Sequence, residues 1–180
     1  ENKHPYAISH SISEEIIIKA QKNCNNLKTK VLRLSNCFGR PINKDANCWY
    51  ILINDICKQA IITNKIIVKS RSNTVRNFIP ISTVIYFIED LISQKYEKAP
   101  QIINIGEKFS LSINEVLELV LSRLFLTLKR KPEIIFNNYN KEKDYLEYET
   151  NILKELDFNK YYSFKKEIDN LILFCHENFE

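Results

Sequence analysis

The sequence predicts an α/β fold, because short apolar runs that suit buried strands alternate with longer segments of helical periodicity. Its 180 residues, 44% of them hydrophobic and 27% charged, are sufficient for one full domain or two small lobes. The expected strands lie at 30–41, where the strand leads into a loop, and at 65–70, 75–81, 101–106 and 133–136. The expected helices lie at 7–23, 48–62, 82–96, 110–128, 151–157 and 164–179.

Residues at the helix ends support three of these elements. Pro5 suits the first turn of a helix, and isoleucines follow it at every fourth position. Ser82 and Thr83 are expected to cap the third helix. Ser112 and Glu115 form the Ser-x-x-Glu pattern of a capping box, in which the side chains and backbone of the first turn bond reciprocally.

Charge and composition argue against several classes of partner. The net charge is +4, but lysines and arginines are scattered among acidic residues, so we expect no nucleic-acid binding. We find no signal peptide and no apolar run of the roughly 20 residues that a bilayer span needs, so we expect a soluble protein without membrane contact. The five cysteines include no CxxC pair, which argues against a disulfide framework or a zinc site and favours a reducing cytoplasm.

Two scarce residue types carry further information. Gly39 and Gly106 are the only glycines, so no glycine-rich turn of the GxGxxG or Walker type can form. Phosphate would therefore have to be bound by side chains or helix ends. Methionine is absent, so Glu1 is not expected to be a translation start, and the chain is expected to be part of a longer one.

Tyr6 and His10 are the first candidate functional residues. Together with Glu14 they lie one turn apart on one face of the first expected helix. Taken alone, a tyrosine and a histidine at this spacing are more often ordinary helix surface than catalytic residues. The motifs that follow along the chain give the pair more weight.

Four short motifs occur in a fixed order. They are YAISH at 6–10, RLSNCFGRP at 33–41, RNFIPIST at 76–83, and NIG at 104–106 with SINE at 112–115. In this order they resemble the C-terminal half of an extended short-chain dehydrogenase/reductase, in the NAD-dependent sugar-nucleotide epimerase/dehydratase family. The resemblance covers nearly the whole chain.

The resemblance implies a division of the chain into two parts. Residues 1–40 and 76–106 would form the C-terminal part of a Rossmann-type parallel sheet, which belongs to the NAD-binding domain. Residues 41–75 and 107–180 would form a smaller α/β substrate-binding lobe for the sugar nucleotide. The glycine-rich half that binds the dinucleotide pyrophosphate would precede residue 1.

The resemblance also implies a role for each candidate side chain. Tyr6 would be the acid/base that exchanges a proton with a sugar hydroxyl while hydride passes to or from NAD, with NADP as the less favoured cofactor. His10 stands where lysine is usual and would share the catalytic and cofactor contacts. Ser35 would also contact the cofactor, while Asn36 and Arg76 would bind the substrate diphosphate. No residue is assigned to a metal.

Several positions depart from the family pattern. At His10, a neutral imidazole can still donate a hydrogen bond, but it lacks the permanent charge by which lysine favours the phenolate. Asn77 and Thr83 stand where the family commonly has aspartates, and Pro80 stands where histidine or tyrosine is frequent. These differences leave the exact substrate open.

Two functions of different class are consistent with the sequence. The first is a portion of a cytoplasmic NAD-dependent sugar-nucleotide epimerase, dehydratase or reductase, which would be a homodimer when complete. The alternative is a non-catalytic, truncated or degenerate relative that acts as a binding module. His10 and the missing glycine turn favour the alternative, whereas Tyr6, Asn36 and Arg76 favour the enzyme. A half sheet would also leave a strand edge unpaired, so we expect the chain alone to associate.

Overall fold

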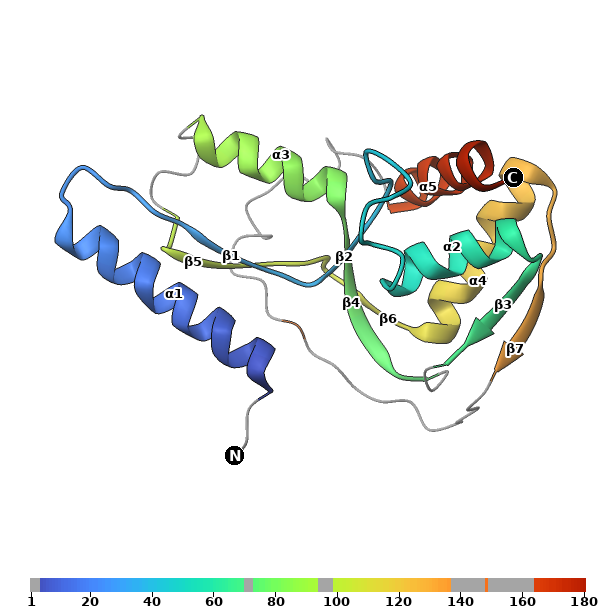
Figure 1. Ribbon diagram of the computed structural model, residues 1–180, viewed down its shortest axis with the longest axis horizontal. Coiled ribbons are helices and arrows are strands. Elements are labelled where there is room, and N and C mark those ends of the chain that lie inside the picture. The colour runs from blue at the N-terminus through green and yellow to red at the C-terminus, as the bar shows by residue number, and fades with distance from the viewer. Residues whose placement is uncertain (1–3, 70–72, 94–98, 137–147, 149–163) are drawn as a thin grey trace.

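The computed structural model describes residues 4–69, 73–93, 99–136, 148 and 164–180 (Figure 1). Its helices are α1 (Pro5–Asn23), α2 (Leu52–Ile62), α3 (Ile81–Ile92), α4 (Ile113–Leu128) and α5 (Phe164–Phe179). Its strands are β1 (Val31–Leu34), β2 (Asn36–Phe38), β3 (Lys65–Val68), β4 (Val75–Pro80), β5 (Ile102–Ile105), β6 (Ser110–Ser112) and β7 (Glu133–Phe136). The helix expected at 151–157 lies outside the described residues. No helix in the described ranges has the length and apolar character needed to cross a membrane.

The strands form three small sheets in which parallel pairs dominate. β1 and β5 are parallel, with Val31 beside Ile102 and Leu34 beside Ile105. β2 pairs in parallel with β4, and β6 adds to the other edge of β4 in antiparallel orientation. β3 and β7 form a further parallel pair. The predicted α/β class with a parallel sheet arrangement is therefore confirmed.

Two features of the strands were not predicted. The expected strand at 30–41 divides at Ser35, because β1 pairs with β5 whereas β2 pairs with β4. The second feature is β6, whose sequence SLS is too short to carry a periodic signal. It is a strand because Ser110 and Ser112 pair with Asn77 and Val75 of β4.

Two groups of buried side chains form the interior. The smaller group brings together α3, β4 and β5 and consists of Ile79, Val84, Phe87, Ile103 and Ile105. The larger group brings together α2, α4, α5 and β3 and includes Ile53, Ile66, Leu117 and Leu171. Figure 1 shows α1, β1, β5 and α3 on one side of the molecule and α2, α4, α5, β3 and β7 on the other. The division at residues 40, 75 and 106 stays a prediction.

The start of α3 differs from the prediction. Its N-cap is Pro80, which makes no capping hydrogen bond with a side chain. The Ser82 hydroxyl instead donates to the Glu167 carboxylate of α5, and Thr83 is buried. The expected caps at Ser82 and Thr83 are therefore wrong, because a tertiary contact with α5 takes the hydroxyl that would have capped the helix.

The start of α4 follows the prediction. Ser112 Oγ accepts a hydrogen bond from the Glu115 backbone N–H at 3.2 Å. In return, the Glu115 carboxylate accepts one from the Ser112 backbone N–H at 2.7 Å. The capping box predicted from the sequence is confirmed.

α1 contributes no buried residue. It is held beside β1 by polar contacts at two points along the helix. Arg33 of β1 donates to both carboxylate oxygens of Glu14 at 2.9 and 2.6 Å. At the other end, the Thr29 backbone N–H and hydroxyl donate to Gln21 Oε1 at 2.6 and 3.0 Å. Gln21 therefore lies near the beginning of β1 and Glu14 near its end, so α1 runs antiparallel to β1.

Candidate active site

The first turns of α1 present Tyr6 and His10. Pro5 occupies the first turn, and His4 caps the helix by accepting a hydrogen bond on Nδ1 from the Tyr6 backbone N–H at 3.3 Å. The ring centroids of Tyr6 and His10 lie 4.3 Å apart, with the planes inclined at 46°. Both side chains are exposed, and Tyr6 has 68% of its surface accessible. The predicted pair is in contact on the surface of this chain.

The Glu14–Arg33 ion pair determines where Tyr6 and His10 lie relative to the strands. Tyr6 precedes Glu14 by eight residues, which is about 12 Å of helix. Because α1 is antiparallel to β1, Tyr6 lies beyond the carboxyl end of β1. Figure 1 shows the first turn of α1 at the end of the helix that is directed toward β4 and β6. Hydrogen bonding to Arg33 lowers the pKa of Glu14, as expected for a carboxylate beside a guanidinium.

Ser35 lies where the chain passes from β1 to β2. Its backbone N–H donates to the Ile105 carbonyl at 2.8 Å, at the carboxyl ends of β1 and β5. Its hydroxyl is buried and has no hydrogen-bond partner among the residues that the structure describes. The Tyr148 hydroxyl lies at the same strand ends, 3.3 Å from the Arg33 carbonyl and 3.4 Å from the Ile105 carbonyl. The carboxyl ends of parallel strands are where α/β folds bind ligands.

Asn36 and Arg76 line one pocket of about 360 Å³, which we call the Arg76 pocket. Asn36 Nδ2 donates to the Asn77 carbonyl at 2.8 Å, which ties β2 to β4 and leaves the second amide N–H of Asn36 for another acceptor. The Arg76 guanidinium is exposed and makes no hydrogen bond or ion pair within the described ranges. The structure therefore brings the two predicted substrate-binding residues together.

The remaining walls of the Arg76 pocket were not singled out from the sequence. They are formed by Cys37, Tyr50, Ile51, Leu52, Phe78 and Ile113. The one available signal was the aromatic pair Trp49–Tyr50 shortly after the GRP sequence. Burial raises the pKa of Cys37 to about 11, and the nearby Glu167 carboxylate acts in the same direction. The Cys37 thiol is therefore a neutral wall of the pocket and not a nucleophile at neutral pH.

The predicted site residues form two separate groups in this structure. One group is the ring pair Tyr6–His10 on α1, and the other is the pair Asn36–Arg76 in the Arg76 pocket. Neither Tyr6 nor His10 is among the residues that line the Arg76 pocket. Ser35 directly precedes Asn36, at the point where the chain leaves β1.

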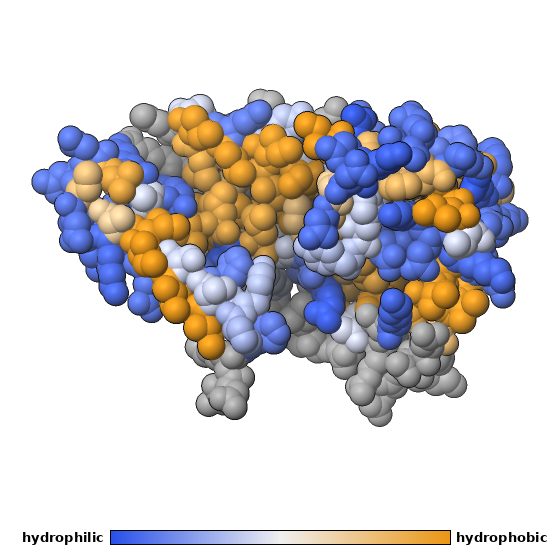
Figure 2. All heavy atoms as spheres, in the orientation of Figure 1, coloured by the Kyte–Doolittle hydropathy of each residue, from blue (hydrophilic) through white to orange (hydrophobic). Residues whose placement is uncertain are grey.

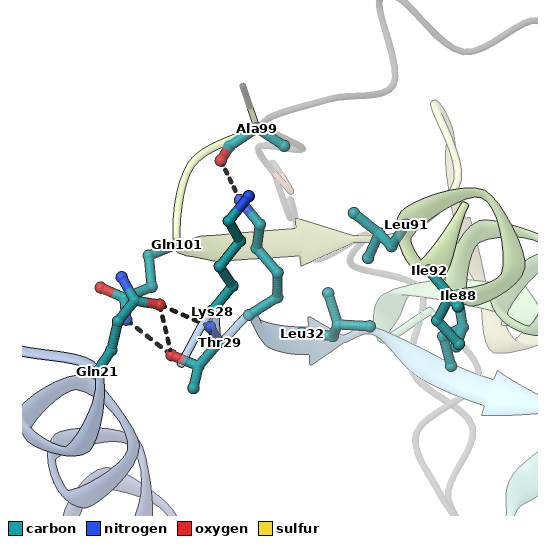
Figure 3. Close-up of a pocket in the computed structure, with 10 residues that line it drawn as sticks. Gln21, Lys28, Thr29, Leu32, Ile88, Leu91, Ile92, Ala99 and Gln101 are labelled. Atoms are coloured by element: carbon teal, nitrogen blue, oxygen red, sulfur yellow. Dashed lines mark hydrogen bonds between the residues drawn. The ribbon is translucent and has the colours of Figure 1, made fainter. Parts of the chain in front are cut away.

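A larger hollow of about 710 Å³, called here the apolar hollow, lies between the C-terminal parts of α1 and α3. In Figure 3, three apolar side chains of α3 lie across the hollow from Leu32 of β1, while Gln21, Thr29 and Gln101 form a hydrogen-bonded polar edge. Figure 2 shows apolar side chains gathered on the surface between α1 and α3. In the described part of the chain β1 pairs with β5 alone. None of the predicted site residues lines this hollow.

The order of these strands and helices, with the parallel pairs β1–β5 and β2–β4, defines an α/β protein. The family model of the NAD dependent epimerase/dehydratase family matches residues 1–106. Because this match spans more than half of the 180 residues, the chain belongs to that family. No match was found among curated protein sequences.

Solved structures share the fold at low sequence identity. A dTDP-glucose 4,6-dehydratase from Bacillus anthracis, solved with NAD, is 19% identical with a TM-score of 0.70, over 99% of this chain and 54% of that one. A UDP-glucuronic acid 4-epimerase from Bacillus cereus, solved with NAD, is 16% identical with a TM-score of 0.71, and the match covers 100% of this chain and 54% of that one. A UDP-glucose 4-epimerase from Thermotoga maritima, solved with UDP-glucose, is 16% identical with a TM-score of 0.65, and the match covers 100% of this chain and 56% of that one. The chain spans about half the length of these structures.

Proposed function

We propose that this chain forms part of an NAD-dependent enzyme that acts on a sugar nucleotide as an epimerase, dehydratase or reductase. The observation that carries the proposal is the Arg76 pocket, which is lined by the Asn36 amide and by a guanidinium that has no partner among the described residues. The planar guanidinium of Arg76 suits a diphosphate, and the second amide N–H of Asn36, which has no acceptor in the described part of the chain, adds a neutral donor beside it. The pocket volume of about 360 Å³ lies within the usual range of small-molecule sites.

The groups near the carboxyl end of β1 fit a nicotinamide dinucleotide. The Ser35 hydroxyl is buried without a partner in the described residues, and Tyr6 and His10 offer a phenol and an imidazole in mutual contact. Hydroxyl, phenol and imidazole are suitable partners for ribose hydroxyls and a carboxamide. When bound, NAD would supply the hydride acceptor, with NADP as the less favoured cofactor.

In this proposal Tyr6 is the acid/base. Its phenolic oxygen takes the proton from a sugar hydroxyl as the carbonyl forms and returns it when the hydroxyl is restored. His10, with its ring centroid 4.3 Å from that of Tyr6, orients the phenol and donates a hydrogen bond toward the cofactor. Because a neutral imidazole favours a phenolate less than a lysine would, activity should rise at higher pH than in a His10→Lys variant.

Rate profiles against pH for NAD-dependent turnover of sugar nucleotides test these roles. Tyr6→Phe should lower turnover by about 10²- to 10⁴-fold while leaving nucleotide binding unchanged. His10→Lys should move the rising limb of the profile to lower pH. Undiminished turnover in Tyr6→Phe would contradict the acid/base assignment. Identical profiles with and without His10→Lys would refute the role given to His10.

A second candidate function is a non-catalytic binding module. Two observations favour this candidate: 68% of the Tyr6 surface is accessible, and Tyr6 is not among the residues that line the Arg76 pocket. Under either function, Arg76→Ala should weaken sugar-nucleotide binding. A binding module would bind the sugar nucleotide but show no turnover with NAD or NADP, whereas the enzyme would show both.

For the complete protein we further propose a cytoplasmic homodimer. All five cysteines are free, which suits a reducing compartment. Ile8, Ile12 and Ile16 form an exposed apolar stripe on α1, which suits contact with another helix. Light scattering on the complete protein would measure its mass, and a monomer would contradict this proposal.

A further inference from the structure

Glu167 of α5 is a buried carboxylate near the ends of β2 and β4, with 4% of its surface accessible. Its Oε1 accepts a hydrogen bond from the Arg40 backbone N–H at 3.3 Å, and its Oε2 accepts one from the Ser82 hydroxyl. We call these two hydrogen bonds the Glu167 bridge. The Arg40 guanidinium lies over the Phe174 ring, 5.9 Å from its centroid. Within the described residues the carboxylate therefore bonds to neutral donors and to no cation.

The Glu167 bridge joins two positions that continue the register of β2 and β4. The pairing of these strands ends with Phe38 beside Pro80. Arg40 and Ser82 each lie two residues further along the chain, so they are the next positions on the same register. Pro80 has no backbone N–H, and in the described ranges no pair follows it. The carboxylate therefore extends the contact between the two strands beyond the point where their own pairing ends.

The turn after β2 leaves room for the carboxylate. A Cβ atom at Gly39 would lie 2.5 Å from Glu167 Oε1 and 2.4 Å from Ile81 Cγ2, and φ at Gly39 is +150°. Asn54 of α2 holds the same turn from another side, because it accepts from the Gly39 N–H at 3.2 Å and donates to the Gly39 carbonyl at 2.9 Å. Asn54 ties the turn to α2, whereas Glu167 ties it to the segment that follows β4.

Stability alone does not account for a carboxylate at this position. A buried charge that meets only neutral donors costs free energy, and replacing buried charges with apolar side chains of similar volume is often neutral or stabilising. The amino end of α3, where Pro80 is the N-cap without a side-chain hydrogen bond, offsets part of this cost because a helix dipole is positive there. The feature that an apolar side chain could not supply is a pair of acceptor oxygens, one for each strand end.

The two strands joined by the Glu167 bridge carry the two predicted substrate-binding residues. Asn36 begins β2, and Arg76 lies near the beginning of β4. Glu167 itself does not line the Arg76 pocket. Because β2 has only three residues, loss of the bridge would let its end separate from β4 and would shift the Asn36 amide relative to the Arg76 guanidinium.

We propose that Glu167 is a positioning residue of the Arg76 pocket, which acts through the alignment of β2 with β4 and not by touching the ligand. This inference rests on the proposed function, since it names a distant residue that supports the same site. It predicts that removing the two acceptor oxygens weakens ligand binding in protein that remains folded.

Isothermal titration of the complete protein with UDP tests this role. The stoichiometry reports the folded fraction able to bind, whereas the dissociation constant reports the geometry of the pocket. Only binding that is lost in Arg76→Ala is assigned to the pocket. Glu167→Met keeps the volume but removes both acceptors, so it should weaken UDP binding roughly 3- to 30-fold at unchanged stoichiometry.

Two further variants separate the bridge from the negative charge. Glu167→Gln should bind UDP within about twofold of the wild type, because its amide can accept from the Arg40 N–H and donate to the Ser82 oxygen. Ser82→Ala removes one of the two hydrogen bonds and should fall between the wild type and Glu167→Met. A loss in Glu167→Gln as large as that in Glu167→Met would overturn the bridge as the cause.

Asp169→Asn is the matched control, because it changes a second carboxylate of α5 whose partner lies on α4. Arg123 Nε donates to Asp169 at 2.7 Å. This variant should lower the melting temperature and leave the affinity for UDP unchanged. Equal losses of affinity in Glu167→Met and Asp169→Asn would overturn the proposal, because the effect would then come from a general loosening of α5. A lower stoichiometry at the wild-type dissociation constant in Glu167→Met would also overturn it.

The outcomes distinguish this inference from the proposed function. If Glu167→Met binds UDP as tightly as the wild type while Arg76→Ala does not, the positioning role fails and the proposed function stands. If the wild type does not bind UDP, the proposed function fails, and hydrogen exchange then tests the bridge. The β2 amides should exchange faster in Glu167→Met than in Asp169→Asn, and equal rates would overturn the alignment of the strands by Glu167.

Discussion

At the scale of single residues, Asn77 of β4 connects β2 to the loop between β5 and β6, next to the Arg76 pocket. Its Nδ2 donates to the carbonyls of Glu107 and Phe109 at 2.8 and 3.0 Å, and its Oδ1 accepts from the Glu107 backbone N–H at 3.0 Å. Its own carbonyl accepts from the Asn36 amide. An ionised aspartate at this position could accept but could not donate. The asparagine therefore suits the local backbone, in which two carbonyls face the side chain.

We predict that Asn77→Asp destabilises the fold by about 3 kcal/mol at neutral pH, because a buried carboxylate would face two carbonyl oxygens. Protonation lets the carboxyl donate again, so the loss should shrink as the pH falls. Urea unfolding at several pH values measures this difference. The control is Asn43→Asp, because Asn43 Oδ1 is exposed and accepts from the Asp45 backbone N–H at 3.1 Å, a role a carboxylate keeps. Equal effects of the two variants would contradict the prediction.

Gly106, at the end of β5, allows its backbone to approach the Asn77 and Tyr148 side chains closely. A Cβ atom at this position would lie 2.4 Å from Asn77 Oδ1 and 2.6 Å from Tyr148 Cε1. Gly106→Ala is therefore expected to destabilise the fold by about 1–3 kcal/mol, as measured by urea unfolding. Adding Tyr148→Ala should restore part of the loss, since it removes one of the two clashes. Complete restoration would show that Asn77 is not the main obstacle.

At the scale of elements, α1 is the one of the five described helices that contributes no buried residue. It buries no side chain and is fastened by the Glu14–Arg33 pair and the Gln21–Thr29 hydrogen bonds. Such an element is expected to open before the rest of the fold, because opening exposes little apolar surface. Since α1 carries Tyr6 and His10, the geometry of the proposed chemistry depends on these polar contacts.

We predict that Glu14→Gln increases hydrogen exchange of the α1 amides by about twofold at neutral pH, as expected from about 0.5 kcal/mol for an exposed ion pair. Because the pKa of Glu14 is lowered in the folded state, the pair stabilises above the ordinary value of 4.5 and loses this effect as the pH falls through the lowered value. The difference between wild type and variant should therefore vanish in acid. Glu15→Gln is the control, because Glu15 and Lys19 form a looser exposed pair at 3.6 Å. A difference that persists in acid would exclude the ion pair as its cause.

At the scale of the whole molecule, the two sides of the chain are unequally covered. The larger core is enclosed by α2, α4 and α5, whereas the apolar hollow between α1 and α3 leaves large side chains accessible, with Ile88 at 38% and Ile92 at 77%. β1 has a hydrogen-bonded partner on one edge in the described residues. Exposed apolar surface beside an unpaired strand edge favours association between molecules.

We predict that the 180-residue chain self-associates and binds a hydrophobic dye, as measured by size-exclusion chromatography with light scattering. Ile88→Lys combined with Ile92→Lys should reduce the associated mass, because both residues line the apolar hollow. Ile42→Lys should leave association unchanged, because Ile42 is exposed outside the hollow. A monodisperse monomer that melts cooperatively would contradict the prediction.

Much of the fold was predictable because its signals are local. Helical periodicity and the Ser112–Glu115 capping box located α1 and α4, and short apolar runs located the paired strands β1, β5 and β7. The caps expected at the start of α3 were not found, because the Ser82 hydroxyl bonds to Glu167, a residue far along the chain. The contact of Tyr6 with His10 follows from one turn of helix, so spacing alone predicted it.

The position of Asn36 and Arg76 in one pocket could not be predicted from local spacing. These residues are 40 positions apart and are brought together by the parallel pairing of β2 with β4. The family motifs indicated both residues but not the walls around them. Tyr50 joins them from a loop whose position depends on Trp49 packing against α5.

Periodicity and end residues act within a few positions of the chain, so they define helices, strands and single side-chain pairs. A pocket depends on contacts between distant segments, and only folding determines these.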